Sequence, residues 1–316
     1  FKTSKKYQMD NWLLLSQFWF YKTCKTTNKI LEMKISDIKH RLIPYRINKK
    51  NNIYDRSLVS LPSFPIYLFY HIYCGPNDWK GIFYEQIELM IKYNLIKKIS
   101  RIYLTIIGFE NDKKFIISQI PHDKINIVYF SSDGSCFEFP CLSEMKRISQ
   151  SENFYALYIH TKGSSYSRFQ YNNKYGKFET LWLNTISWRN IMNYFNITKW
   201  NMAVNALANG YDTYGCIKMS PHSTIQKYHY SGNFWWSTSE NIKKCSEIDT
   251  QYINNRWLAE LWIINDGSKA YCPFYSYLLL YEAYISSSTY LKPWYHRENI
   301  KYALYYFFKA RKHLLY

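Results

Sequence analysis

The sequence predicts an α/β fold built on a mostly parallel sheet, and two patterns lead to this prediction. Apolar runs of strand length recur between residues 65 and 160, and helical periodicity or turn residues separate them. Parallel strands need such crossover connections, because a tight turn can join only antiparallel strands. Apolar residues make up 47% and aromatic residues 20% of the 316 residues, which supports a large core and excludes a disordered or fibrous protein.

The first strand is expected at 66–73, where IYLFYHIY is continuously apolar, as in a strand buried on both faces. An amphipathic helix should follow, since apolar residues recur at helical spacing between 83 and 91. The other expected elements are strands at 101–107, 125–130 and 154–159 and a short helix at 142–148. Ligands of open parallel sheets bind beyond the carboxyl ends of the strands, which nominates segments 71–79, 108–112, 131–135 and 160–165.

The positive charge is concentrated at the two ends of the chain. The formal net charge is +18, but residues 1–60 alone hold 13 basic against 4 acidic side chains. We therefore expect a basic aromatic N-terminal extension at 1–61, a body at 62–295 and a basic amphipathic C-terminal helix at 296–316. This last helix either packs on the body or contacts an anionic membrane peripherally. Binding of single-stranded nucleic acid is disfavoured, because the charge does not follow the aromatic residues through the body.

The seven cysteines indicate reduced thiols. They include no CxxC pair, which argues against a structural zinc site, and their odd number argues against a complete disulfide framework. No run of 18 apolar residues and no signal-peptide pattern is present. A cytoplasmic protein is expected.

Three segments carry residues suited to chemistry. His160-Thr161-Lys162-Gly163 ends a predicted strand, where lysine charge and glycine backbone suit a diphosphate, although an ordinary polar turn has the same pattern. In 227–236, dense aromatic residues surround Ser231-Gly232-Asn233, which suits a sugar or a base but also a buried aromatic corner. Arg256 and Glu260, at i and i+4 on an expected helix, are either a base with its orienting partner or a surface ion pair.

These segments resemble a family of glycosyltransferase-like proteins of large DNA viruses and bacteria that is distantly related to rhamnan-synthesis proteins. The similar segments run in a consistent order over roughly residues 66–290, and the aromatic block at 229–236 is the most specific of them. They are His71-Ile72-Tyr73-Cys74, Asn77-Asp78-Trp79, Glu85-Gln86, Ile106-Ile107-Gly108, Tyr158 to Gly163, Trp188-Arg189, His229 to Trp236, and Arg256 to Ile263.

The resemblance implies a Rossmann-like GT-A sheet and transfer of a sugar from a nucleotide-sugar donor to a hydroxyl group of a glycan, protein or lipid-linked acceptor. By this resemblance and their place at strand ends, the residues expected at the donor are His71, Asn77, Asp78, His160, Thr161, Lys162, Gly163 and Arg189. Those expected in the sugar and acceptor pocket are His229, Ser231, Asn233, Trp235, Trp236 and Arg256. Glu260 is favoured over Asp133 as the base of a single inverting displacement, with a retaining outcome left open.

One departure from the family bears on cofactors. GT-A enzymes usually hold a divalent metal through an Asp-x-Asp motif after the fourth strand, where this chain has His160-Thr161-Lys162. Either Lys162 neutralises the diphosphate alone, or Mn²⁺ or Mg²⁺ binds elsewhere, for example at Asp133 or His229. The departure also leaves open a noncatalytic carbohydrate-binding or structural relative.

Overall fold

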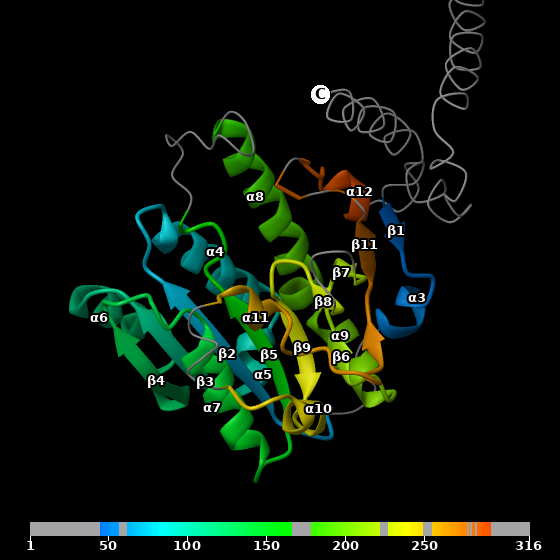
Figure 1. Ribbon diagram of the computed structural model, residues 1–316, viewed down its shortest axis with the longest axis horizontal. Helices are drawn as coiled ribbons and strands as arrows, with labels where there is room; N and C mark the ends of the chain where they lie inside the picture. The colour runs from blue at the N-terminus through cyan, green and yellow to red at the C-terminus, as the bar shows by residue number, and fades with distance from the viewer. Residues whose placement is uncertain are drawn as a thin grey trace, which may run out of the picture. The chain divides into compact units, whose positions relative to one another are not determined.

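The computed structural model describes one compact unit, which lies within Tyr45–Asn299 (Figure 1). The residues described are 45–56, 62–165, 178–221, 227–248, 255–276, 278, 280–281 and 283–291. The C-terminal helix expected at 296–316, and residues 1–44 of the expected extension, lie outside them. None of the helices in these ranges is long and apolar enough to cross a membrane.

A seven-stranded sheet with the order β10-β6-β9-β5-β2-β3-β4 forms the centre of this unit. Its strands are β2 (Ile66–Tyr73), β3 (Ile99–Ile107), β4 (Ile125–Ser131), β5 (Tyr155–His160), β6 (Thr213–Tyr214), β9 (Trp235–Thr238) and β10 (Ala270–Tyr271). β2, β3, β4 and β5 are parallel, whereas β9 runs antiparallel to both β5 and β6. The predicted α/β class with a mostly parallel sheet flanked by helices is confirmed.

The four parallel strands lie within two residues of their predicted bounds, because each is an apolar run closed by turn residues. The sequence analysis was wrong about the connection between β3 and β4, which contains helix α6 (Glu110–Ser118). Only Ile116 of α6 is buried, so the helix lacks the apolar stripe by which an amphipathic helix is recognised. The helix expected around Arg256 and Glu260 is also shorter than expected, since α11 covers only Trp257–Glu260 and Arg256 precedes it.

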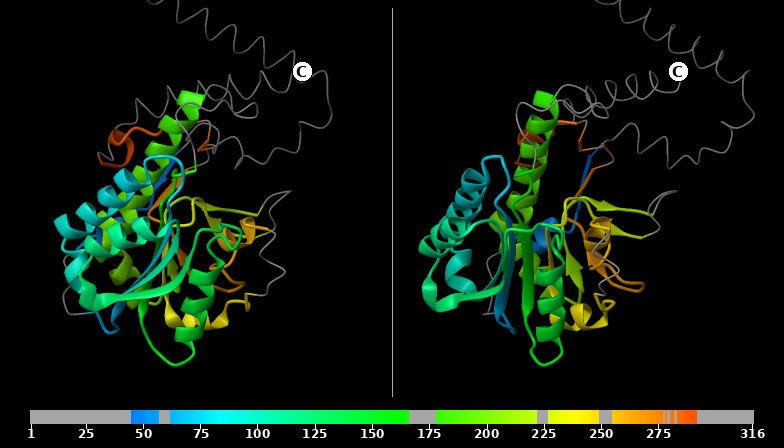
Figure 2. Two further views of the ribbon diagram at one scale, coloured as in Figure 1. Left: turned by 90° about the vertical axis from the view of Figure 1, so that its left-hand side faces the viewer. Right: turned by 60° about the vertical axis from the view of Figure 1, so that its left-hand side comes forward.

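Helices cover both faces of the sheet (Figure 2). On one face, α7 (Phe139–Ser149), α10 (Ser239–Lys244) and α11 share a buried cluster with Tyr67, Phe69 and Trp235. On the other face, Tyr70 packs on Phe83 of α4 (Trp79–Lys92). The remaining helices are α3 (Asn51–Tyr54), α5 (Leu95–Lys98), η1 (His122–Lys124), α8 (Phe178–Asn193), η2 (Tyr194–Thr198), α9 (Trp200–Ala208) and α12 (Ser288–Leu291).

Residues 45–56 pack within the same unit. β1 (Tyr45–Ile47) pairs antiparallel with β11 (Phe274–Ser276) in a separate two-stranded sheet. Asn51 of α3 donates to the Pro273 carbonyl and accepts from the Tyr271 hydroxyl at 2.7 Å. A third small sheet pairs β7 (Lys218–Met219) with β8 (His229–Tyr230).

The core is rich in tyrosine, and several of its buried hydroxyl groups are hydrogen-bonded. The Tyr70 hydroxyl donates to Gln86, and that of Tyr214 donates to the Phe195 carbonyl at 3.0 Å. The Tyr230 hydroxyl donates to the Tyr271 carbonyl at 3.0 Å. Each such hydrogen bond gives a packing contact a preferred geometry, which an aliphatic residue in the same place would lack.

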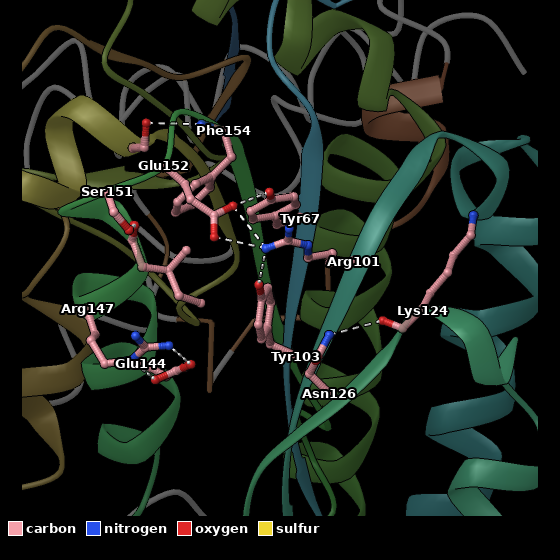
Figure 3. A network of polar contacts seen from close by, with 12 residues as sticks. Tyr67, Arg101, Tyr103, Lys124, Asn126, Glu144, Arg147, Ser151, Glu152 and Phe154 are labelled. Atoms are coloured by element: carbon pink, nitrogen blue, oxygen red, sulfur yellow. Dashed lines mark hydrogen bonds and ion pairs between the residues drawn. The ribbon is translucent and has the colours of Figure 1, made fainter.

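At the amino end of the sheet, a polar network joins three parallel strands (Figure 3). Glu152, just before β5, accepts from the Tyr67 hydroxyl at 2.6 Å and from Arg101 at 2.9 Å. Arg101 also donates to the Tyr103 hydroxyl at 3.3 Å, and its guanidinium lies 5.1 Å from the centre of the Tyr67 ring. The hydrogen bond from Tyr67, followed by that from Arg101, lowers the pKa of Glu152 although partial burial opposes this.

Replacing Glu152 by Gln should lower the free energy of unfolding by about 1–2 kcal/mol, because a neutral amide is a weaker acceptor for the buried Tyr67 hydroxyl and for Arg101. The matched control is Glu144→Gln, whose carboxylate pairs only with Arg147 on the surface of α7 and should matter by less than about 0.5 kcal/mol. Urea unfolding measures both. Because the pKa of Glu152 is lowered in the folded state, the stability that Glu152 contributes is lost as the pH falls. Equal losses of unfolding free energy in Glu152→Gln and Glu144→Gln would contradict this account.

Candidate active site

Strand pairing gathers the candidate residues at the carboxyl edge of the parallel strands. His71, two residues before the end of β2, and His160, the last residue of β5, are direct neighbours in register. Because β9 is antiparallel to β5, the turn that precedes β9 reaches this same edge. The His160 side chain contacts that turn, with its Nε2 2.9 Å from the Gly232 carbonyl oxygen.

Glu138, immediately before α7, lies at the centre of this group. Its carboxylate accepts a hydrogen bond from the Tyr158 hydroxyl at 2.8 Å and a second, short one from the Asn233 amide. Burial alone would raise the pKa of Glu138, but the imidazoles of His160 and His71 and these two hydrogen bonds outweigh it and lower the pKa. Glu138 is therefore ionised at neutral pH.

The two histidines are neutral. Burial lowers the pKa of His71 to about 4 and also lowers that of His160, although the Glu138 carboxylate opposes both shifts. His71 is buried, and its Nδ1 has no hydrogen-bond partner among the described residues.

The turn formed by Ser231, Gly232 and Asn233 depends on left-handed backbone, with φ of 88° at Gly232 and 57° at Asn233. Asn233 tolerates this conformation better than most residues, and its side chain secures it, donating to Glu138 and accepting from Trp235 Nε1 at 2.8 Å. The Ser231 carbonyl accepts from Trp188 at 3.2 Å. The sequence segment expected to form a sugar pocket thus supplies a rigid turn.

Glu260, at the end of α11, faces the same turn. Burial raises the pKa of Glu260 and the Glu138 charge adds to this rise, while Lys162, Arg256 and a hydrogen bond from the Gly232 backbone oppose it. The two carboxyl groups, Glu138 and Glu260, are thus shifted in opposite directions. Paired titratable groups with opposed shifts are typical of acid–base sites.

Lys162 supplies a buried positive charge beside Glu260. Its Nζ lies 4.0 Å from the centre of the Trp188 ring and 6.0 Å from that of Tyr281. The Lys162 carbonyl accepts from Arg189 at 3.1 Å, and Arg189 is in turn ion-paired with Glu85 of α4 at 2.9 Å. Arg189 therefore holds the turn that carries Lys162.

Several other predicted donor residues hold loops together. Thr161 Oγ1 accepts from the Tyr73 backbone N–H at 2.9 Å and donates to the Tyr73 carbonyl at 3.0 Å. Asn77 donates to the Ser164 carbonyl through its backbone N–H at 3.1 Å. Asp78 caps α4 by accepting from the Gly81 N–H at 3.1 Å, and Gly163 has a φ of 102°. These contacts join the loops that follow β2 and β5.

The other five predicted residues lie in different settings, and only Arg256 among them is near enough to Glu260 to act on its pKa. Trp235 and Trp236 are fully buried, so their rings belong to the core and offer no face to a ligand. Asp133 is exposed and accepts from the Ser135 hydroxyl at 2.7 Å within its own loop, which lowers its pKa. His229 lies on β8 opposite Met219. Arg256 is exposed at the start of α11, where its guanidinium lies 5.5 Å from the centre of the Trp257 ring.

Sequence reasoning missed Glu138 and Tyr158. Tyr158 was hidden in an apolar strand, where a tyrosine is ordinary core. Glu138 carried a usable signal, because Pro140 is in the first turn of α7 and proline there marks a helix start. Because the helix was expected to begin at 142, its actual start at Phe139 was missed, and with it the carboxylate of Glu138 immediately before the helix.

An exposed aromatic ring lies between two glycines at the same edge. Tyr73, the last residue of β2, is 36% exposed. A Cβ added at Gly75 would lie 2.6 Å from the Tyr73 ring, and one added at Gly134 would lie 3.7 Å from it. The loop at Gly75 can approach the ring this closely because Gly75 has no side chain, whereas a Cβ at Gly134 would make ordinary van der Waals contact.

The residues after β5 do not fit the divalent cation that the resemblance implies. In the described part of the chain, no group of three or more His, Cys, Asp or Glu side chains is arranged to hold a metal ion. At the place of the acidic motif, His160 is bonded to Gly232 and Thr161 to Tyr73, while Lys162 brings a positive charge. Of these three residues, Lys162 is the one whose charge suits an anion.

Replacing Gly232 by Ala should lower the free energy of unfolding by about 3 kcal/mol or more, since left-handed backbone costs about 1–2 kcal/mol and a clash adds to it. The new Cβ would lie 2.5 Å from Met192 Sδ and 2.8 Å from Trp188 Nε1. Gly210→Ala is the matched control, because Gly210 has a φ of 84° and no atom within 4 Å of an added Cβ. Thermal and urea unfolding compare them, and equal losses would show that the turn has room to yield.

No protein-family model and no curated protein matches the chain. Among solved structures, the chain is similar to 4-diphosphocytidyl-2C-methyl-D-erythritol synthase from Anaerococcus prevotii, at 13% identity and a TM-score of 0.33. The match covers 79% of this chain and 99% of that one. A TM-score of this size assigns no substrate or activity to the present protein.

Proposed function

We propose that this protein is a glycosyltransferase that moves a sugar from a nucleotide-sugar donor to a hydroxyl acceptor by a single inverting displacement. The observation that carries the proposal is the pair of carboxyl groups with opposed pKa shifts, Glu260 and Glu138, beside Lys162 at the carboxyl edge of a parallel sheet. This edge is where such sheets bind their ligands. The resemblance of residues 66–290 to glycosyltransferase-like proteins supports the same class.

In the proposed reaction, Glu260 takes the proton of the acceptor hydroxyl as its oxygen attacks the anomeric carbon. The bond between that carbon and the diphosphate oxygen breaks, and the diphosphate leaves with the electron pair. A carboxylate with a raised pKa is a stronger base than an exposed one, which favours Glu260 over Asp133. The products are the glycoside, the nucleoside diphosphate and protonated Glu260.

The positive charges of Lys162 and Arg256 suit the negatively charged diphosphate that leaves in the proposed reaction. Lys162 is 5% exposed and lies against Trp188, so water screens its charge little. Arg256 adds an exposed guanidinium near Glu260 and His160. We place the nucleotide over the strand ends between 71–78 and 131–135, where the Tyr73 ring offers a face to a base.

The donor class can be tested by thermal unfolding with UDP, GDP, dTDP and CMP, each with and without manganese. We expect one nucleotide to raise the melting temperature, by the mass-action stabilisation that a ligand of the folded state gives. Manganese should not be required, because Lys162 stands where the acidic motif would be. Stabilisation by none of the four, together with sugar binding, would favour a noncatalytic carbohydrate-binding protein.

Replacing Glu260 by Gln should reduce transfer by at least about 100-fold while donor binding persists, because removal of a general base affects the chemical step. Glu240→Gln is the control, since Glu240 is an exposed residue of α10 that pairs with Lys244 at 3.3 Å. Asp133→Asn tests the second candidate for the base. Unchanged turnover in Glu260→Gln would remove Glu260 from this role, and a loss in Asp133→Asn alone would transfer the role to Asp133.

A further inference from the structure

Glu138 hydrogen-bonds to side chains from two other segments of the chain. It is a half-buried carboxylate that joins three separate parts of the chain, namely the start of α7, Tyr158 in the middle of the sheet and Asn233 before β9. A buried charge costs free energy unless it is paired or hydrogen-bonded. The Tyr158 hydroxyl and the Asn233 amide could each donate to a neutral acceptor, so the negative charge of Glu138 itself needs an explanation.

The explanation lies in what the turn next to Glu138 holds. The Gly232 carbonyl accepts from His160, and a Gly232 backbone hydrogen bond lowers the pKa of Glu260. The backbone is left-handed at Gly232 and Asn233, where these contacts are made. The amide of Asn233, the residue that follows Gly232, is bonded to Glu138.

We infer that Glu138 is the positioning residue of this site: through Asn233 it fixes the Ser231-Gly232-Asn233 turn, whose backbone then holds His160 and Glu260 in place. The inference rests on the proposed function only for the assignment of Glu260 as the base. Glu138 acts on Glu260 in two ways, since its hydrogen bond to Asn233 orders the turn and its negative charge disfavours the ionised form of Glu260.

These two effects can be separated, because they change the pKa of Glu260 in opposite directions. The groups that act on Glu260 are Glu138 just before α7, Lys162 from the loop after β5, Arg256 just before α11 and the Gly232 backbone, and the charge of Glu260 in turn raises the pKa of Tyr158 in β5. Glu138→Gln removes the charge and keeps an oxygen that can accept from Asn233, so the pKa of Glu260 should fall. Asn233→Gly keeps the left-handed backbone and the Glu138 charge but removes the tie, so the pKa should rise.

The measurement is a ¹³C NMR titration of glutamate side-chain carboxyl groups in the full chain, with Glu260→Gln used to assign the Glu260 signal. Glu138→Asp serves as a second variant that keeps the charge and shortens the reach to Asn233, and it should raise the midpoint as Asn233→Gly does. Glu144→Gln, on the same helix but paired only with Arg147, is the control and should leave the midpoint unchanged.

A fall in Glu138→Gln with a rise in Asn233→Gly supports the inference. If Glu138→Gln does not fold, a rise in both Glu138→Asp and Asn233→Gly supports it instead. No shift, or shifts of the same sign in Glu138→Gln and Asn233→Gly, would overturn it, because general loosening of the site moves both variants alike. Failure of every donor to be transferred would sink the proposed function and leave this titration result intact.

Kinetics give a second readout once transfer is measured. Asn233→Gly should lower kcat at least 10-fold and leave the KM for the donor within twofold of the original. The acid limb of the pH–kcat profile should move to higher pH in Asn233→Gly and to lower pH in Glu138→Gln, because Glu260 works as a base only when it is deprotonated. Equal changes of kcat and KM, with no movement of the limb, would overturn the positioning role.

Discussion

The reversal of strand direction between β5 and β9 is the constraint on which the site depends. β5 pairs parallel with β2 on one side and antiparallel with β9 on the other. The parallel side brings the carboxyl ends of two strands together, and the antiparallel side brings the beginning of a third strand to the same edge. Without that reversal, Gly232 and Asn233 would lie at the opposite end of the sheet, far from His160.

The same arrangement explains why the site is rigid. Trp235, which pairs with Tyr158 across the reversal, stacks on its ring with centroids 5.0 Å apart. Two residues before it, Asn233 is bonded both to the Trp235 indole and to Glu138. A displacement of the turn would therefore disturb packing in the centre of the sheet, so the core resists movement of the polar groups at its edge.

Sequence reasoning located the parallel half of the fold because its strands are long, apolar and bounded by turn residues. It failed for the other half of the sheet, which consists of β9, β6 and β10, since β6 and β10 are two residues long and carry no periodicity. The aromatic block at 229–236 was recognised as unusual, yet its tryptophans are core and its small polar residues face the site. Whether the tryptophans or the small polar residues face the site depends on the direction of β9. That direction is set by pairing with β5 and β6, which are distant in the sequence.

The site could be predicted in part for a related reason. His160 and Lys162 stand at the end of a recognisable strand, so their position followed from the rule for parallel sheets. Glu138 and Glu260 come from short loops and a four-residue helix, and only tertiary packing brings their charges near each other. The opposed pKa shifts arise from burial and from neighbours that are distant in sequence.

The tyrosine-rich core restricts how this sequence can change over evolutionary time. A leucine core tolerates single replacements of similar volume, whereas several buried tyrosines share their hydroxyl groups with a partner elsewhere in the chain. Loss of the Tyr70 hydroxyl would leave Gln86 buried without that donor, and loss of Gln86 would strand the hydroxyl. Substitutions in this interior must therefore occur in compensating pairs. Partner residues on separate elements of the fold are expected to covary rather than diverge independently.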